Sequence, residues 1–125
     1  RHAHALALLA EVHLERGDTQ RAVEESRQAM VLLEGLGAVP EGETRIRYVH
    51  ARTLVAAGDQ GTAKGVLKEA IARLVQRASR LEDDALRESF LATPDARALL
   101  ELADRWGIPR PDVADAAHAD TEPPG

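Results

Sequence analysis

The sequence predicts an all-α protein, and three observations support this fold class. The chain contains 23 alanines and 16 leucines but only three isoleucines and three aromatic residues, so strong helix formers dominate and strand formers are scarce. Apolar side chains recur at spacings of three and four over most of the chain, which is typical of helices with one buried face. Glycines, prolines and capping residues divide these segments into about six helices.

Charge and composition exclude several classes of protein. A net charge of −5 argues against a nucleic-acid backbone or an anionic membrane as partner. No apolar run approaches the roughly 20 residues that a membrane span needs. The absence of cysteine excludes a disulfide framework and a thiolate metal site. We therefore expect a cytoplasmic protein with neither nucleic acid nor membrane as its partner. Because the helical pattern starts at the first residues, we also expect a piece of a larger protein.

A first helical hairpin is expected over residues 3–36. Gly17 ends its first helix with a residue that tolerates a left-handed turn, and Asp18 or Thr19 can cap the second. The second helix should end near residues 35–37. The expected core-facing positions are Leu6, Leu9, Ala10, Val12, His13 and Leu14 in the first helix, then Ala22, Val23, Ser26, Ala29, Met30 and Leu33 in the second.

A second hairpin is expected over residues 43–80, with Gly58 as its turn and Asp59 as a cap. Gly65 falls inside its second helix, where glycine costs roughly 1 kcal/mol relative to alanine. We expect close helix packing to explain it, and a functional hinge is the alternative. The expected core-facing positions are Ile46, Val49, His50, Ala51, Leu54 and Val55, then Ala63, Val66, Leu67, Ala70, Ile71, Leu74 and Val75.

A shorter closing helix pair is expected over residues 82–106. Asp83 or Asp84 should start its first helix, and Thr93-Pro94-Asp95 is a strong start signal for its second, which should stop at Gly107. Residues 107–125 are rich in proline, aspartate and alanine and are expected to form a flexible tail. The expected core-facing positions are Ala85, Leu86, Ser89, Phe90 and Leu91, then Ala96, Leu99, Leu100, Leu102, Ala103 and Trp106.

The two hairpins repeat a sparse pattern at an offset of 41 residues. The matched pairs are Ala10 with Ala51, Gly17 with Gly58, Asp18 with Asp59, Ala22 with Ala63, Ala29 with Ala70, and Leu33 with Leu74. Small residues stand where helices would touch, and Gly-Asp stands at the turn. This pattern resembles the tetratricopeptide repeat, in a variant longer than the usual period of about 34. Residues 47 and 50 depart from it, with arginine and histidine at positions that are large and apolar in the family.

The resemblance implies an α–α superhelix of stacked helix–turn–helix repeats, in which the first helix of each pair lines a concave binding surface. By that pattern the exposed inner positions are His4, Ala7, Leu8, Glu11 and Glu15 in the first repeat, and Arg45, Tyr48, Val49, Arg52 and Ala56 in the second. Seven of these are our candidate partner-binding residues: His4, Leu8, Glu11, Glu15, Arg45, Tyr48 and Arg52. For Arg45 and Arg52 the alternative is a solvated helix face with local ion pairs, worth only about 0.3–0.5 kcal/mol each. The Lys-and-Asn set that binds chaperone tails in one branch of the family is missing, so a chaperone-tail adaptor is disfavoured.

No motif in the sequence indicates catalysis. His13 and His50 could approach each other between stacked helices, but a metal site needs more convergent ligands. We expect partly buried imidazoles with hydrogen-bond partners instead. The paired carboxylates lack a cleft to face across, and no glycine-rich loop follows a strand. We therefore expect no catalytic residue, no cofactor and no metal.

The leading hypothesis is a non-catalytic protein–protein interaction module, at the C-terminal end of a larger bacterial signalling or regulatory protein. Its partner would be a protein, a peptide or another domain of the parent chain, and a homodimer through exposed helix faces is also open. The alternative is the regulatory helical domain of a multidomain enzyme such as a kinase, a cyclase or an ATPase regulator. A small helical enzyme or metal protein is the third hypothesis.

Overall fold

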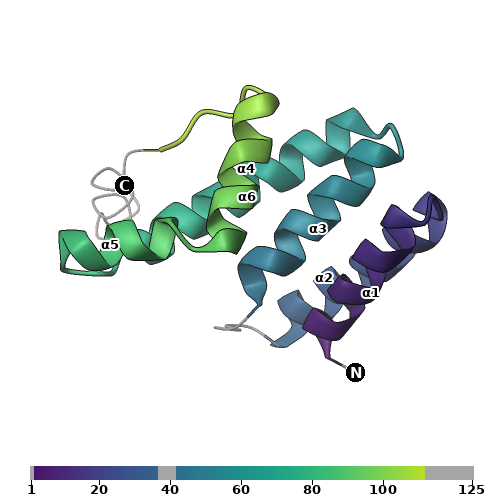
Figure 1. The fold of residues 1–125 in the computed structure, drawn as a ribbon, viewed down its shortest axis with the longest axis horizontal. Coiled ribbons are helices and arrows are strands. Elements are labelled where there is room, and N and C mark those ends of the chain that lie inside the picture. Colours follow the sequence, from purple (N-terminus) through teal and green to yellow (C-terminus); the bar gives the residue numbers. More distant parts are fainter. Residues whose placement is uncertain (1, 37–41, 112–125) are drawn as a thin grey trace, which may run out of the picture. The chain divides into compact units, whose positions relative to one another are not determined.

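The structure, a computed structural model, describes residues 2–36 and 42–111, and within them it contains six helices and no strand (Figure 1). The predicted all-α class is therefore confirmed. The helices are α1 (Ala3–Glu15), α2 (Thr19–Leu36), α3 (Glu43–Ala56), α4 (Gln60–Ser79), α5 (Asp84–Leu91) and α6 (Pro94–Arg105). The chain divides into two compact units, residues 1–67 and 68–125, and α4 runs from the first into the second.

In the first unit, α1, α2 and α3 contact one another, and their shared core is built largely from alanine (Figure 1). Ala7, Ala10, Ala22 and Ala29 are all fully buried. Because an alanine side chain is a single methyl group, helices that meet at alanines can approach closely. The larger members of this core are Leu6, Met30, Leu33, Ile46 and Val49.

The two Gly-Asp sequences form the same backbone turn. Gly17 and Gly58 both have φ of 83°, in the left-handed region that favours glycine. After each glycine the aspartate N–H donates to a carbonyl five residues back, at 2.9 Å to His13 and 3.0 Å to Leu54. Each glycine N–H donates to a carbonyl three residues back at 3.1 Å. This is the Schellman arrangement, which satisfies helix-end carbonyls. Asp59 also accepts from the Thr62 N–H at 3.4 Å, as the cap prediction requires.

The offset of 41 residues also appears in side-chain burial. Matched residues have nearly identical exposed fractions, 0% for Ala10 and Ala51, 0% for Ala22 and Ala63, and 2% for Leu33 and Leu74. The sequence repeat therefore corresponds to a repeat of turns and of core positions. Stacking of the repeats into a superhelix stays a prediction.

The core-facing side of α1 differs from the expected one. Leu9 and Val12 are 43% and 42% exposed, whereas Ala3 and Ala7 are buried. Apart from the face that carries His4, Glu11 and Glu15, apolar residues occupy most sides of α1, so periodicity alone left its core-facing side ambiguous. The core prediction for Leu9 and Val12 was wrong.

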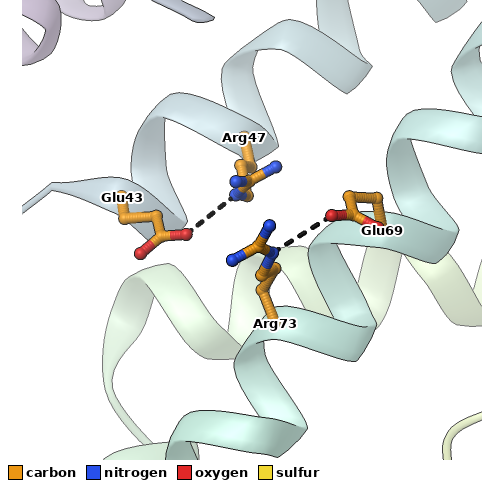
Figure 2. Close-up of polar contacts among 4 residues, drawn as sticks. All are labelled: Glu43, Arg47, Glu69 and Arg73. Carbon is orange, nitrogen blue, oxygen red and sulfur yellow. Dashed lines mark hydrogen bonds and ion pairs between the residues drawn. The ribbon is translucent and has the colours of Figure 1, made fainter. Parts of the chain in front are cut away.

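A buried arginine occupies the repeat position of a core leucine. Arg47 is 6% exposed, as is Leu6, its counterpart 41 residues earlier. Its Nε donates to Glu43 Oε2 at 3.0 Å, one turn earlier on α3 (Figure 2). The carboxylate offsets the cost of burying the guanidinium. Figure 2 also shows a pair of the same spacing in the second unit, Glu69–Arg73, whose side chains are about half exposed and which therefore contributes little.

In the second unit α5 contacts α6 but buries no residue completely. Ala85, Leu86 and Ser89 are exposed, so the core prediction for them was wrong; Phe90 and Leu91 are half-buried. Arg77 lies over the Phe90 ring, 5.5 Å from its centroid. An eight-residue helix has room for only a narrow apolar stripe, and Phe90 and Leu91 supply it in α5.

The boundaries of α5 and α6 follow their predicted signals. The Asp83 side chain accepts a hydrogen bond from the Ala85 N–H at 2.7 Å, and Pro94 begins α6 as expected. The Thr93 hydroxyl does not cap α6 and instead donates to the Phe90 carbonyl at 2.8 Å. The expected core positions of α6 are buried from Ala96 to Ala103.

Ordered structure continues past Gly107, where we expected a tail to begin. Ile108 is buried, and its N–H donates to the Ala103 carbonyl at 2.9 Å. Arg110 pairs with Asp104 through Nη2 and Oδ2 at 2.5 Å. The rest of the predicted tail, residues 112–125, lies outside the described residues.

One further expectation concerns helix packing at Gly65. A Cβ added to Gly65 would meet no atom within 4 Å, so the expected close helix packing at that glycine was wrong.

Along the described ranges, no helix combines the length and the apolarity needed to cross a lipid bilayer.

Candidate functional site

The structure brings four of the candidate binding residues together between α1 and α3. Glu11 of α1 faces Arg45 and Arg52, which lie two turns apart on α3. Glu11 Oε1 accepts from Arg45 Nε at 2.8 Å and lies 2.7 Å from Arg45 Nη2. Glu11 Oε2 lies 3.5 Å from Arg52 Nη1. The Glu11 carboxylate therefore contacts two guanidiniums, both from residues that are distant from Glu11 in the sequence.

Tyr48 supports Arg52 from the same face of α3. The Arg52 Cζ atom lies 5.7 Å from the centroid of the Tyr48 ring, within the range of a cation–π contact. Tyr48 is half-buried and packs against the core of the first unit. The Arg52 guanidinium is thus held between an aromatic ring and a carboxylate.

The other candidates lie around this cluster or outside it. Leu8, one turn before Glu11 on α1, is 44% exposed. His4 is exposed and its ring lies against Gly42, where an added Cβ would come within 3.1 Å of the imidazole. Glu15 is exposed and makes no polar contact with the described residues. Ala7 and Val49, which the family pattern placed on the inner surface, are fully buried and do not belong to it.

His13 has the partly buried, hydrogen-bonded setting that the sequence led us to expect. Its Nδ1 lies 2.5 Å from Glu25 Oε1, and the two side chains are 15% and 13% exposed. This contact joins α1 to α2. Sequence reasoning missed Glu25, although its position on the core side of α2, three residues after Ala22, was a usable signal.

His50 differs, because its Nδ1 is buried and has no hydrogen-bond partner among the described residues. Burial lowers the pKa of His50 below its ordinary value, and the positive charges of Arg27 and Arg47 lower it further against an opposing effect of Glu34. The expected hydrogen-bond partner for this imidazole is therefore absent from the described part of the chain.

Two hollows lie on the described part of the chain, one in each unit. A hollow of about 410 Å³ lies on the α1–α2 hairpin, and its lining residues are Leu6, Glu24, Arg27, Gln28, Val31 and Leu32. A second, of about 420 Å³, lies in the other unit against α5 and α6. Within residues 2–36 and 42–111, no three histidine, aspartate or glutamate side chains are placed to hold one metal ion.

Comparison of the chain with protein-family models, with curated proteins and with solved structures found no match. The class of the protein therefore comes from its own fold, which is all-α.

Proposed function

We propose that this chain is a non-catalytic protein–protein interaction module whose binding surface is centred on Glu11, Tyr48, Arg45 and Arg52. The observation that carries the proposal is the ordered contact of these four side chains beside the exposed Leu8. Charged, aromatic and apolar groups are thereby presented together.

Physical features of this cluster support binding. Arginine and tyrosine are enriched among the residues that contribute most to protein interfaces. Side chains that already hold one conformation lose less entropy when a partner arrives. The ion pairs and the cation–π contact restrain Arg45 and Arg52 in this way.

We further propose that the module works in the cytoplasm, as part of a larger bacterial signalling or regulatory protein, and that its partner is a protein, a peptide or another domain of its parent chain. The lack of cysteine supports a reducing compartment. The repeated turns and core positions support a scaffold whose surface residues vary while its frame is kept.

Site-specific photo-crosslinking tests the proposal. A photoreactive amino acid at Leu8 should give a discrete protein adduct in bacterial cells, and the same group at Gln20, an exposed polar position on α2, should not. The adduct should disappear when Tyr48→Ala and Arg52→Glu are combined. A Leu8 adduct that survives both substitutions, or equal adducts at the two positions, would contradict this surface.

A further inference from the structure

An apolar stripe on α1 is open to solvent. Leu9 and Val12 are 43% and 42% exposed, and Ala5, one turn before Leu9, is exposed as well. Their spacing of four and three residues places them on one side of the helix. We call Ala5, Leu9 and Val12 the α1 stripe. Apolar side chains that gather on one side of a surface helix form the kind of patch at which proteins bind one another.

The repeat offset of 41 residues relates this stripe to three side chains of α3. The counterparts of its residues are Ile46, His50 and Thr53. Ile46 and Thr53 are 1% and 0% exposed, and the Nδ1 atom of His50 is buried. The same three positions are therefore covered on α3 and open on α1.

Helix α2 supplies cover for these positions on α3. The hydroxyl of Thr53 lies 2.8 Å from the hydroxyl of Ser26 on α2. Ile46 belongs to the same core cluster as Met30 and Leu33 of α2. A helix that packs on α1 as α2 packs on α3 would therefore cover the α1 stripe.

A second copy of this chain does not offer a free face of that kind. On α2 the residues concerned are Ser26, Met30 and Leu33, which are 0%, 9% and 2% exposed. The equivalent residues of α4, 41 positions later, are also buried, each at most 2% exposed. They are Leu67, Ile71 and Leu74. Because both faces are already buried within the chain, neither can cover the α1 stripe of another copy.

The α1 stripe differs chemically from its counterpart on α3. Leu9 and Val12 stand where α3 has His50 and Thr53, so the α1 stripe carries no hydroxyl at the position of Thr53. A serine opposite Val12 would find no hydroxyl across the interface, whereas a small apolar side chain would pack on the valine. The covering helix is therefore expected to be apolar where α2 has Ser26.

From this equivalence we infer that the α1 stripe binds an amphipathic helix of a partner protein, which packs on α1 as α2 packs on α3 and carries a small apolar residue at the position of Ser26. Such a helix presents apolar side chains at positions i, i+4 and i+7. The inference goes beyond the proposed function and does not depend on it, because none of the four residues at the centre of the proposed binding surface belongs to the α1 stripe.

Fluorescence anisotropy with two matched peptides tests the inference. The probe is a fluorescein-labelled, end-capped peptide with the sequence of α2, residues 19–36, and the substitution Ser26→Ala. It should bind the full chain saturably. A control peptide that also carries Met30→Gln and Leu33→Gln keeps a similar helix propensity but loses its apolar face. The control should bind at least about tenfold more weakly.

Substitutions in the chain locate the binding site. Leu9→Gln should weaken binding of the probe about tenfold, because an apolar contact of the α1 stripe is lost. Val31→Gln is the matched control, since Val31 is 64% exposed on α2 and its replacement should leave binding unchanged.

Val12→Thr tests the expected chemistry of the partner helix. The unsubstituted chain should bind the probe about threefold more tightly than it binds the same peptide with serine kept at position 26. Val12→Thr introduces the hydroxyl that Thr53 offers to Ser26, and it should remove or reverse this preference. An unchanged preference would contradict the equivalence between α1 and α3.

A photoreactive amino acid at Leu9 identifies the occupant of the α1 stripe. Mass spectrometry should find this residue joined to the probe. A cross-link to a second copy, or to residues 112–125 of the same chain, that excludes the probe would assign the α1 stripe to that occupant and overturn the inference.

Three other results would also overturn it: no saturable binding of the probe, equal binding of the control peptide, or equal losses in Leu9→Gln and Val31→Gln. Circular dichroism should show unchanged helix content in Leu9→Gln. If that variant loses helix, the peptide preference of Val12→Thr decides.

The combined substitutions Tyr48→Ala and Arg52→Glu separate this inference from the proposed function. They should leave binding of the probe unchanged, although they should remove the adduct expected at Leu8. Loss of probe binding in this variant would place the probe on the surface around Glu11 and reject the α1 stripe as its site. A Leu8 adduct without probe binding would leave the proposed function standing alone.

Discussion

The hydroxyl of Ser26 on α2 lies 2.8 Å from the hydroxyl of Thr53 on α3, and both residues are fully buried. Each hydroxyl also reaches a carbonyl in its own helix, Val23 at 3.0 Å and His50 at 2.9 Å. The two hydroxyls have one proton each, whereas there are three contacts. One hydroxyl therefore donates to the other across the helix pair, and the second donates to the carbonyl in its own helix. This pair is a polar link inside an apolar core.

Removing either hydroxyl should destabilise the protein modestly. Ser26→Ala and Thr53→Val should each lower the free energy of unfolding by about 1 kcal/mol, because the remaining hydroxyl keeps a backbone acceptor. Urea denaturation of both variants and of the double variant gives their coupling energy, which should be about 0.5–1 kcal/mol. Additive effects would show that the interhelical hydrogen bond contributes nothing.

The contact between His13 and Glu25 should contribute more to stability than the exposed pair of Glu24 and Arg27 beside it. Glu25→Ala should lower the free energy of unfolding by about 1–3 kcal/mol, because a part-buried group loses its partner. Glu24→Ala is the matched control: Glu24 pairs with Arg27 at 3.5 Å, both side chains are mostly exposed, and a change below about 0.5 kcal/mol is expected. Equal unfolding midpoints in urea for the two variants would contradict the assignment.

His50 should make stability depend on pH. Its pKa is lower in the folded protein than the ordinary 6.5, so the unfolded chain binds more protons as the pH falls. The contribution of neutral His50 is complete above pH 6.5 and is lost as the pH falls through the folded pKa. His50→Gln should flatten the fall in the free energy of unfolding between about pH 7.5 and pH 5. An unchanged slope in that variant would assign the pH dependence to other groups.

Two glycines close in sequence should respond to alanine with opposite signs. Gly58 has φ of 83°, where a Cβ is strained, and Gly58→Ala should destabilise the protein by about 1 kcal/mol. Gly65 lies inside α4 with open space around its Cβ position, and Gly65→Ala should stabilise it by about 0.5–1 kcal/mol. Thermal unfolding measures both, and a destabilised Gly65→Ala would show that this glycine has a packing role.

The sequence predicted the helices, their turns and most of the buried faces. Gly17 and Gly58 end helices because glycine readily adopts the left-handed backbone conformation, and this preference does not depend on tertiary contacts. The faces of α2, α3 and α6 were predicted well because polar residues flank their apolar positions. In α1 the same reasoning failed for Leu9 and Val12, since apolar residues occupy most sides of that helix.

Part of the candidate surface was also predictable. The positions of Glu11, Arg45, Tyr48 and Arg52 came from the family pattern on two separate helices. Their mutual contacts did not, because a salt bridge between α1 and α3 depends on the distance and rotation between helices. Periodicity reports neither quantity.

By itself, then, the sequence determined an all-α chain with a repeated Gly-Asp turn and alanine contacts at a period of 41 residues. These features follow from local backbone preference and side-chain size. The tertiary structure alone decided that Glu11 joins two arginines, that His13 meets Glu25 and that Arg47 is buried beside Glu43. Those outcomes depend on which helix faces approach within a few ångströms, and only packing sets that distance.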